Sequence, residues 1–147
     1  MPAFDVEYQP SPWGPIAEEV ERYERTGGAE PSVLVGDQWV VLWTLGARSR
    51  KVRKAPLVRI ADGEGRYAVI GSMGGAPSDP QWVGNVRANP VARLQDGATV
   101  RDYAVREVHG AEKARWWARA IAVWPDYDSY QAATDRVIPL FVLEPPG

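Results

Sequence analysis

Short runs of β-branched and aromatic residues, separated by glycine turns, are the feature that most restricts the folds open to this chain. Two hairpins are expected, one joining strands at 57–60 and 67–71 through Asp62-Gly63-Glu64-Gly65, the other joining 91–95 and 99–108 through Asp96-Gly97. Turns of this type connect antiparallel neighbours. Further strands are expected at 33–35, 39–45 and 137–143. Because strands and helices do not alternate regularly, a Rossmann fold is disfavoured and an antiparallel barrel is predicted.

Four helical segments are expected around these strands, at 15–26, 80–88, 111–123 and 126–134. Pro15 suits the first turn of the first helix, and Gly27-Gly28 provides its stop. Asp79 is predicted to cap the second helix, with Pro80 at the first helical position. The fold class is therefore mainly β with flanking helices. A chain of 147 residues is expected to form one domain, 1–147, with an N-terminal helix.

The chain has no cysteine and a single histidine, His109. The absence of cysteine excludes disulfides and thiolate nucleophiles, and one histidine cannot build a histidine-based metal site. We therefore expect no metal, a structural role for His109, and an organic cofactor for any redox chemistry. No apolar run is long enough to cross a bilayer and no signal-peptide pattern is present. A cytoplasmic protein without membrane contact is expected.

A compact basic stretch begins at Arg48. Five of the seven residues 48–54 are Arg or Lys, although the whole chain carries a net charge of −2. A nucleic-acid binder usually spreads its basic residues over a face that can follow a phosphate backbone, so no nucleic-acid partner is expected. A solvated loop is the ordinary interpretation of such a run. Its place between a strand and Pro56-Leu57, at the rim of the expected barrel, favours a small phosphate-bearing ligand.

A glycine-rich turn, Gly71-Ser72-Met73-Gly74-Gly75-Ala76-Pro77, precedes the helix at 80–88. It lacks the Gly-Lys-Ser/Thr of a P-loop, and two adjacent glycines alone indicate only a tight turn. Glycines let a backbone lie against a flat ring because no Cβ intervenes, and a turn before a helix can offer N–H donors to an anion. The turn is therefore a second candidate ligand contact.

The order of these short motifs resembles the deazaflavin-dependent nitroreductase family of actinobacteria. The motifs are Gly-x-Arg-Ser from Gly46, Arg-x-x-Pro-Leu from Arg53, Ser-x-Gly-Gly-Ala-Pro from Ser72 and Pro-x-Trp-x-x-Asn-x-x-Ala-Asn-Pro from Pro80. The resemblance extends over about residues 40–145. It implies a split β-barrel, like that of FMN-binding proteins, with the deazaflavin coenzyme F420 as its cofactor.

The resemblance further implies that the basic region holds the phosphate and acidic tail of the coenzyme, while the glycine turn contacts its ring. The cofactor-binding residues expected on this basis are Arg48, Arg50, Lys51, Arg53, Pro56, Ser72, Met73, Gly74, Gly75, Ala76 and Asn85. Asn85 is equally consistent with a structural amide. Met73 stands where many relatives carry lysine, and Ala55 where some carry asparagine. Arg50 and Lys51 are candidates to compensate for the charge missing at Met73.

Trp124, Tyr127 and Tyr130 recur at intervals of three residues beside Pro125. Their plain interpretation is aromatic packing of a helix corner, but their acidic neighbours predict partly exposed tyrosines. In the resembled family, matching aromatic positions line the substrate pocket. Val58, which stands where some relatives carry tyrosine, is expected to line it as well. Trp82 is expected in the core.

The leading hypothesis is an enzyme that transfers hydride from reduced F420 to an electron-poor small molecule, namely a quinone, an enone or a nitroaromatic. Ser72, Tyr127 and Tyr130 are the expected catalytic residues, since they can bond the oxygen of the acceptor and Tyr130 or solvent can supply the proton. Two alternatives stay open: a non-catalytic F420-binding or storage protein, and an FMN-binding split-barrel protein. The oligomeric state is also open.

Overall fold

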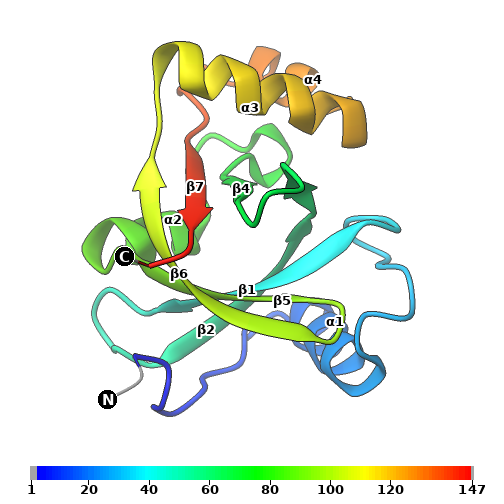
Figure 1. The fold of residues 1–147 in the computed structure, drawn as a ribbon, viewed down its shortest axis with the longest axis vertical. Coiled ribbons are helices and arrows are strands. Elements are labelled where there is room, and N and C mark those ends of the chain that lie inside the picture. The colour runs from blue at the N-terminus through cyan, green and yellow to red at the C-terminus, as the bar shows by residue number, and fades with distance from the viewer. Residues whose placement is uncertain (1–2, 147) are drawn as a thin grey trace.

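The computed structural model describes residues 3–146; the ends of the expected domain, residues 1–2 and 147, lie outside this range. Its strands form one antiparallel sheet in the order β2-β1-β5-β6-β7-β4-β3 (Figure 1). The strands are β1 (Trp39–Leu45), β2 (Val52–Val58), β3 (Ile60–Ala61), β4 (Tyr67–Ile70), β5 (Val91–Asp96), β6 (Thr99–Glu107) and β7 (Leu140–Glu144). The helices are α1 (Gly14–Thr26), α2 (Gln81–Ala88), α3 (Gly110–Val123) and α4 (Tyr127–Ala132), with a short 3-10 turn η1 (Met73–Gly75).

The sheet curls into a barrel because its two outermost strands are consecutive in the chain. β2 ends at Val58 and β3 begins at Ile60, so Arg59 alone joins the opposite ends of the strand order. The Arg59 N–H donates a hydrogen bond to the carbonyl oxygen of Gln38 at 2.9 Å. A sheet with its edges joined in this way cannot lie flat. The predicted split β-barrel with flanking helices is therefore confirmed.

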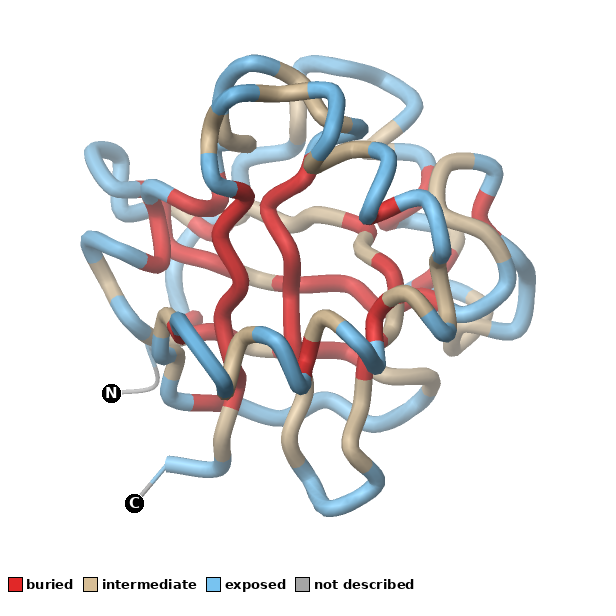
Figure 2. The backbone as a smooth tube through the Cα atoms, turned by 90° about the horizontal axis from the view of Figure 1, so that it is seen from above, coloured by how far each residue is buried: buried red, intermediate tan, exposed pale blue. Residues whose placement is uncertain are grey.

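Hydrophobic side chains inside the barrel form the core, and the helices cover its open sides. Figure 2 shows the buried backbone concentrated in the crossing strands, with exposed segments in the connecting loops. Trp82 of α2 is buried and packs edge-on against Phe141 of β7, with ring centroids 5.7 Å apart, which confirms its expected place in the core. Tyr23 of α1 packs in the same way on Trp39 of β1, at 4.5 Å. Within residues 3–146, no helix is long and apolar enough to span a bilayer.

Three strand predictions need correction. Residues 33–35 form no strand, only an isolated bridge between Ser32 and Gly36. The reason is that Glu19 and Ser32 side-chain oxygens accept the N–H of Leu34, so this segment is held by side chains rather than by a neighbouring strand. The strand expected at 57–60 is divided at Arg59: residues 57–58 end β2, which begins at Val52 and pairs with β1, and Ile60 begins β3, which pairs with β4. The last strand begins at Leu140 instead of residue 137.

The start of α2 also differs from the prediction. Pro80 occupies the N-cap position, the helix begins at Gln81, and no side chain caps its first turn. Asp79 instead accepts a hydrogen bond from Arg136 at 2.6 Å and pairs with Arg87 at 3.5 Å. Two guanidinium groups thus engage the carboxylate that was expected to cap the helix. At the end of α1, the expected stop is confirmed, since Gly27 adopts the left-handed conformation with φ 63°.

Candidate active site

A cavity of about 320 Å³ opens between the barrel and α4. On the barrel side it is lined by Pro56 and Val58 of β2, both buried. Ser72, Met73 and Gly74 of the glycine turn form a second wall, and Trp124, Tyr127 and Tyr130 form a third. One largely apolar space therefore brings together residues that are far apart in the sequence. These are residues that were expected to contact the cofactor or the substrate.

A second cavity, of about 280 Å³, lies beside the first. The two have five wall residues in common, Ile16, Ala55, Met73, Pro80 and Trp82, so they form two parts of one groove. The second part differs in the kind of polar side chain it contains, since Arg53, Lys54, Thr44 and Asn85 line it. One groove thus offers an apolar compartment for a flat ring and a cationic compartment for an anionic tail.

The glycine turn beside the first cavity contains backbone donors that have no backbone partner among the described residues. Ser72 lies in the right-handed helical region, and Met73 and Gly74 follow with φ of 44° and 65°. The N–H groups of Gly75 and Ala76 bond the carbonyls of Ser72 and Met73 inside the turn, at 2.9 and 3.2 Å. Within residues 3–146, the N–H groups of Ser72, Met73 and Gly74 have no such partner. Successive donors in this backbone conformation form a concavity that suits an anionic or electron-rich atom.

The basic stretch divides between the groove and the rim. Arg53 lines the cationic compartment, where it also donates to Gln9 Oε1 at 3.3 Å. Arg48, Arg50 and Lys51 line neither cavity. Arg50 donates to Asn89 Oδ1 at 3.2 Å, Lys51 pairs with Glu7 at 2.8 Å, and Arg48 is exposed on the turn between β1 and β2. The charges expected to compensate for Met73 are therefore held by other partners on the rim.

Lys54 was not among the expected site residues, although it lies in the basic stretch. Its side chain is nearly buried, and its ammonium group pairs with Glu24 at 2.6 Å and lies 3.9 Å from the centroid of the Trp43 ring. A second ring, that of Tyr8, lies 4.3 Å away. Because β2 starts earlier than predicted, Lys54 lies within the strand and opposite Trp43 of β1, the residue whose ring it contacts. The basic run alone gave no signal that distinguished it from its neighbours.

Asn85 ties the basic turn to the barrel. Its Oδ1 accepts the N–H of Ala47 at 3.0 Å, and its Nδ2 donates to Thr44 Oγ1 at 3.0 Å. The side chain is buried with both ends of the amide satisfied. This is the structural amide that the sequence allowed; because Asn85 also lines the cationic compartment, its cofactor contact stays a prediction.

The three aromatic residues differ in exposure. Trp124 and Tyr130 are half-buried, whereas Tyr127 is only 4% exposed, so the expectation of partial exposure is wrong for Tyr127. α4 packs its first turn against the core beside Trp117, which places the Tyr127 ring in the interior. Burial raises the pKa of Tyr127 above its ordinary value, with the nearby Tyr130 adding to the shift. Tyr127 therefore stays a neutral hydroxyl at neutral pH.

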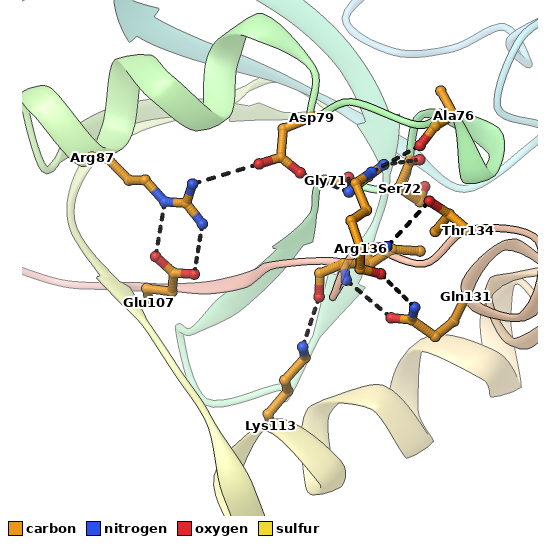
Figure 3. Close-up of polar contacts among 11 residues, drawn as sticks. Gly71, Ser72, Ala76, Asp79, Arg87, Glu107, Lys113, Gln131, Thr134 and Arg136 are labelled. Atoms are coloured by element: carbon orange, nitrogen blue, oxygen red, sulfur yellow. Dashed lines mark hydrogen bonds and ion pairs between the residues drawn. The ribbon is translucent and has the colours of Figure 1, made fainter.

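Arg136 is a second residue at this site that was not predicted from the sequence. It lies between α4 and β7, and its guanidinium group bonds the backbone of the glycine turn and Asp79 (Figure 3). No local motif marks it, because its partners lie 57 to 65 residues earlier in the chain. Only the tertiary fold brings them together. Gly75 and Ala76, which line neither cavity, belong to this rear side of the turn.

A protein-family model described as F420H2-dependent quinone reductase matches residues 16–145 of this chain. The chain belongs to this family. The F420H2-dependent quinone reductase Rv1261c of Mycobacterium tuberculosis is 33% identical over 122 residues, which cover 81% of this chain and 76% of that protein. A solved F420H2-dependent reductase, FDR-A, superimposes with a TM-score of 0.68 at 44% identity, covering 72% of this chain and 93% of the other. A second structure, described as a domain-swapped dimer, has a TM-score of 0.71 and 40% identity, covering 86% and 95%.

Family membership confirms the expected F420-dependent oxidoreductase, with coenzyme F420 as cofactor in place of the FMN alternative. The groove fits this cofactor on its own geometry. A flat deazaflavin ring suits the apolar compartment beside the free amides of Ser72 and Met73, and its phosphate-bearing tail suits the compartment that Arg53 lines. Within residues 3–146, no cluster of His, Asp and Glu side chains has the makings of a metal site.

Proposed function

We propose that this protein reduces quinones with reduced coenzyme F420. The observation that carries the proposal is the two-part groove, in which an aromatic-walled apolar compartment adjoins a cationic one. The relatives named above are themselves described as F420H2-dependent quinone reductases and reductases, which supports the same reaction here. The cofactor supplies a hydride; with one proton, the quinone leaves as its hydroquinone.

Residues of β2 and the glycine turn are proposed to hold the cofactor. Arg53 faces the phosphate and acidic tail, and a guanidinium group can bond two oxygens of such a group at once. The free N–H groups of Ser72, Met73 and Gly74 face the ring. The proline and valine of β2, Pro56 and Val58, give the compartment an apolar wall that excludes water. Arg48, Arg50 and Lys51 are proposed to act from the rim, through the long-range attraction of an anionic ligand.

The acceptor is proposed to lie between the turn and α4. Ser72, Tyr127 and Tyr130 supply the hydroxyl groups around this space, and Trp124 supplies a flat ring against which a quinone can stack. A hydroxyl that bonds the acceptor's oxygen stabilises the negative charge that develops there during hydride transfer. Tyr130 is the proposed proton donor, because it is half-buried and so keeps access to solvent for reprotonation.

The test begins with fluorescence titration of the purified protein with oxidised F420 and, in parallel, FMN. Selective binding of F420, followed by oxidation of the reduced form on addition of a soluble naphthoquinone, is the expected result. An enone and a nitroaromatic in the same assay define the wider acceptor range that the open cavity permits. Tight binding without turnover on any acceptor would favour the storage alternative, and failure to bind F420 would overturn the proposal.

A further inference from the structure

The Arg136 side chain forms hydrogen bonds with backbone carbonyl groups of the glycine turn. The side chain is 14% exposed and donates four hydrogen bonds. The acceptors are the carbonyl oxygens of Gly71 at 3.0 Å, Ser72 at 2.7 Å and Ala76 at 2.8 Å, and Asp79 Oδ1 at 2.6 Å. A planar guanidinium can hold several acceptors in one fixed fan, which an ammonium cannot. Figure 3 shows these contacts converging on the single side chain.

Because the peptide group is planar, the hydrogen bonds to Arg136 also fix the direction of two backbone N–H donors. All peptide bonds of the described chain are trans, so the C=O and N–H of each unit point to opposite sides. The carbonyls of Gly71 and Ser72 point at Arg136, and the N–H groups that share their peptide units belong to Ser72 and Met73. Those two N–H groups therefore point away from Arg136. They are the same donors that lack a backbone partner in residues 3–146.

The two sides of the turn face different spaces. Arg136 borders an outer hollow with Gly75 and Pro77, whereas Ser72 and Met73 line the cavity that also contains the tyrosines of α4. The carbonyl oxygens of Gly71 and Ser72 therefore face Arg136 and the outer hollow, and the N–H groups of Ser72 and Met73 face the cavity. The turn needs such support, because Met73 has a φ of 44°, a backbone conformation that is unfavourable for a side chain larger than glycine.

Arg136 is also fastened to the opposite wall of the cavity. Its carbonyl oxygen accepts a hydrogen bond from Gln131 Nε2 of α4 at 2.8 Å, and Gln131 Oε1 accepts the N–H of Ile138 at 2.9 Å. The helix that carries Tyr127 and Tyr130 is thus connected, through one residue, to the turn that carries Ser72. A change at Arg136 will alter the spacing between the two walls.

We propose that Arg136 is a positioning residue, which aims the N–H groups of Ser72 and Met73 into the cavity and sets the distance between the turn and α4. The inference rests on the proposed function in one respect, that the ring of F420 is what these donors meet. Arg136 itself touches neither ligand; it acts through the backbone that does.

The experiment compares Arg136→Gln and Arg136→Lys with a matched control, Arg87→Gln. Arg87 pairs with the same carboxylate, Asp79, but donates to no carbonyl of the turn. Three readouts are taken: affinity for oxidised F420 by fluorescence titration, amide ¹H–¹⁵N signals of Ser72 and Met73 in the ligand-free protein, and the separate kcat and KM for quinone reduction.

Arg136→Gln is expected to weaken F420 binding about tenfold, to shift the Ser72 and Met73 amide signals, and to lower kcat more than it raises the KM for quinone. Arg136→Lys is expected to recover part of each effect, whereas Arg87→Gln leaves affinity and both signals near wild type. Unchanged affinity and unshifted signals in a folded Arg136 variant would overturn the inference. If Arg136→Gln does not fold, the lysine variant decides on the same readouts. If the wild type itself binds no F420, the proposed function fails, while the amide signals still decide whether Arg136 positions the turn.

Discussion

Trp124 donates a hydrogen bond from its indole Nε1 to the hydroxyl oxygen of Tyr130 at 3.2 Å, and both residues line the proposed acceptor cavity. By accepting this bond, Tyr130 uses a lone pair and keeps its own proton available for another acceptor. The indole also restricts where the hydroxyl can point. Trp124, at first sight a packing residue, therefore orients the group that we propose to donate the proton.

Replacing Tyr130 with phenylalanine removes the hydroxyl and keeps the ring. We expect kcat for quinone reduction to fall by about tenfold or more, because both charge stabilisation and proton delivery are weakened. Affinity for oxidised F420, measured by fluorescence titration, is expected to stay within about twofold. Tyr103→Phe is the matched control, since Tyr103 is a buried tyrosine that lines neither part of the groove. Unchanged turnover in Tyr130→Phe would remove Tyr130 from the proton-donor role.

Gly74 and Gly75 provide a matched pair for testing how closely the turn packs on α4. Both have positive φ, 65° and 82°, but a Cβ at Gly74 would meet nothing within 4 Å. A Cβ at Gly75 would lie 2.8 Å from the carbonyl oxygen of Tyr130. We expect Gly74→Ala to cost about 1 kcal/mol of unfolding free energy, from backbone strain alone. Gly75→Ala is expected to cost about 1–3 kcal/mol more, because backbone must move. Urea denaturation measures the unfolding free energy of both variants. Equal losses of unfolding free energy would show that α4 moves away from the added Cβ without an energetic cost.

The barrel could be predicted from the sequence because its signals are local. Asp-Gly turns and alternating strands give the hairpins, and Gly27 gives the end of α1. The beginning of β2 was not predicted, because a run of Arg and Lys is more typical of a loop than of a strand. In the structure, pairing with β1 outweighs that preference. The segment 33–35 was predicted as a strand because its residues favour one, but Glu19 and Ser32 take the backbone donor that a strand would use.

The candidate site was predictable in part for the same reason. Motif order brought Ser72 and the aromatic residues of 124–130 into view, and the fold places them around one cavity. Arg136 could not be found this way, since the carbonyls it bonds leave no mark in the sequence. Nor could the burial of Tyr127, which depends on how α4 docks against the core.

Met73 lines both the apolar and the cationic compartment, and the residue is 55% exposed. Replacing it with lysine would place a cation where an anionic cofactor tail is proposed to lie. We expect Met73→Lys to tighten binding of oxidised F420 about threefold to tenfold at low salt, with the gain shrinking as salt is raised. Met73→Leu, which keeps the wall apolar, serves as the control in the same titration. No gain at low salt would mean that the tail lies away from this residue.

Tyr127 provides a test by alkaline pH. Burial raises its pKa in the folded protein, whereas in the unfolded chain the value stays near 10.0. The stability that comes from the protonated, buried hydroxyl is therefore fully present below pH 10 and is lost as the pH rises toward the folded pKa, because only the unfolded chain ionises. Between pH 10 and 11.5, the unfolding free energy of the wild-type protein should fall by up to about 1.4 kcal/mol per pH unit more than that of Tyr127→Phe.

The other tyrosines with raised pKa values, including Tyr67 at about 12, contribute equally to both proteins and cancel in the difference. Urea denaturation across this range measures it, and parallel curves for the two proteins would mean that the Tyr127 hydroxyl reaches solvent.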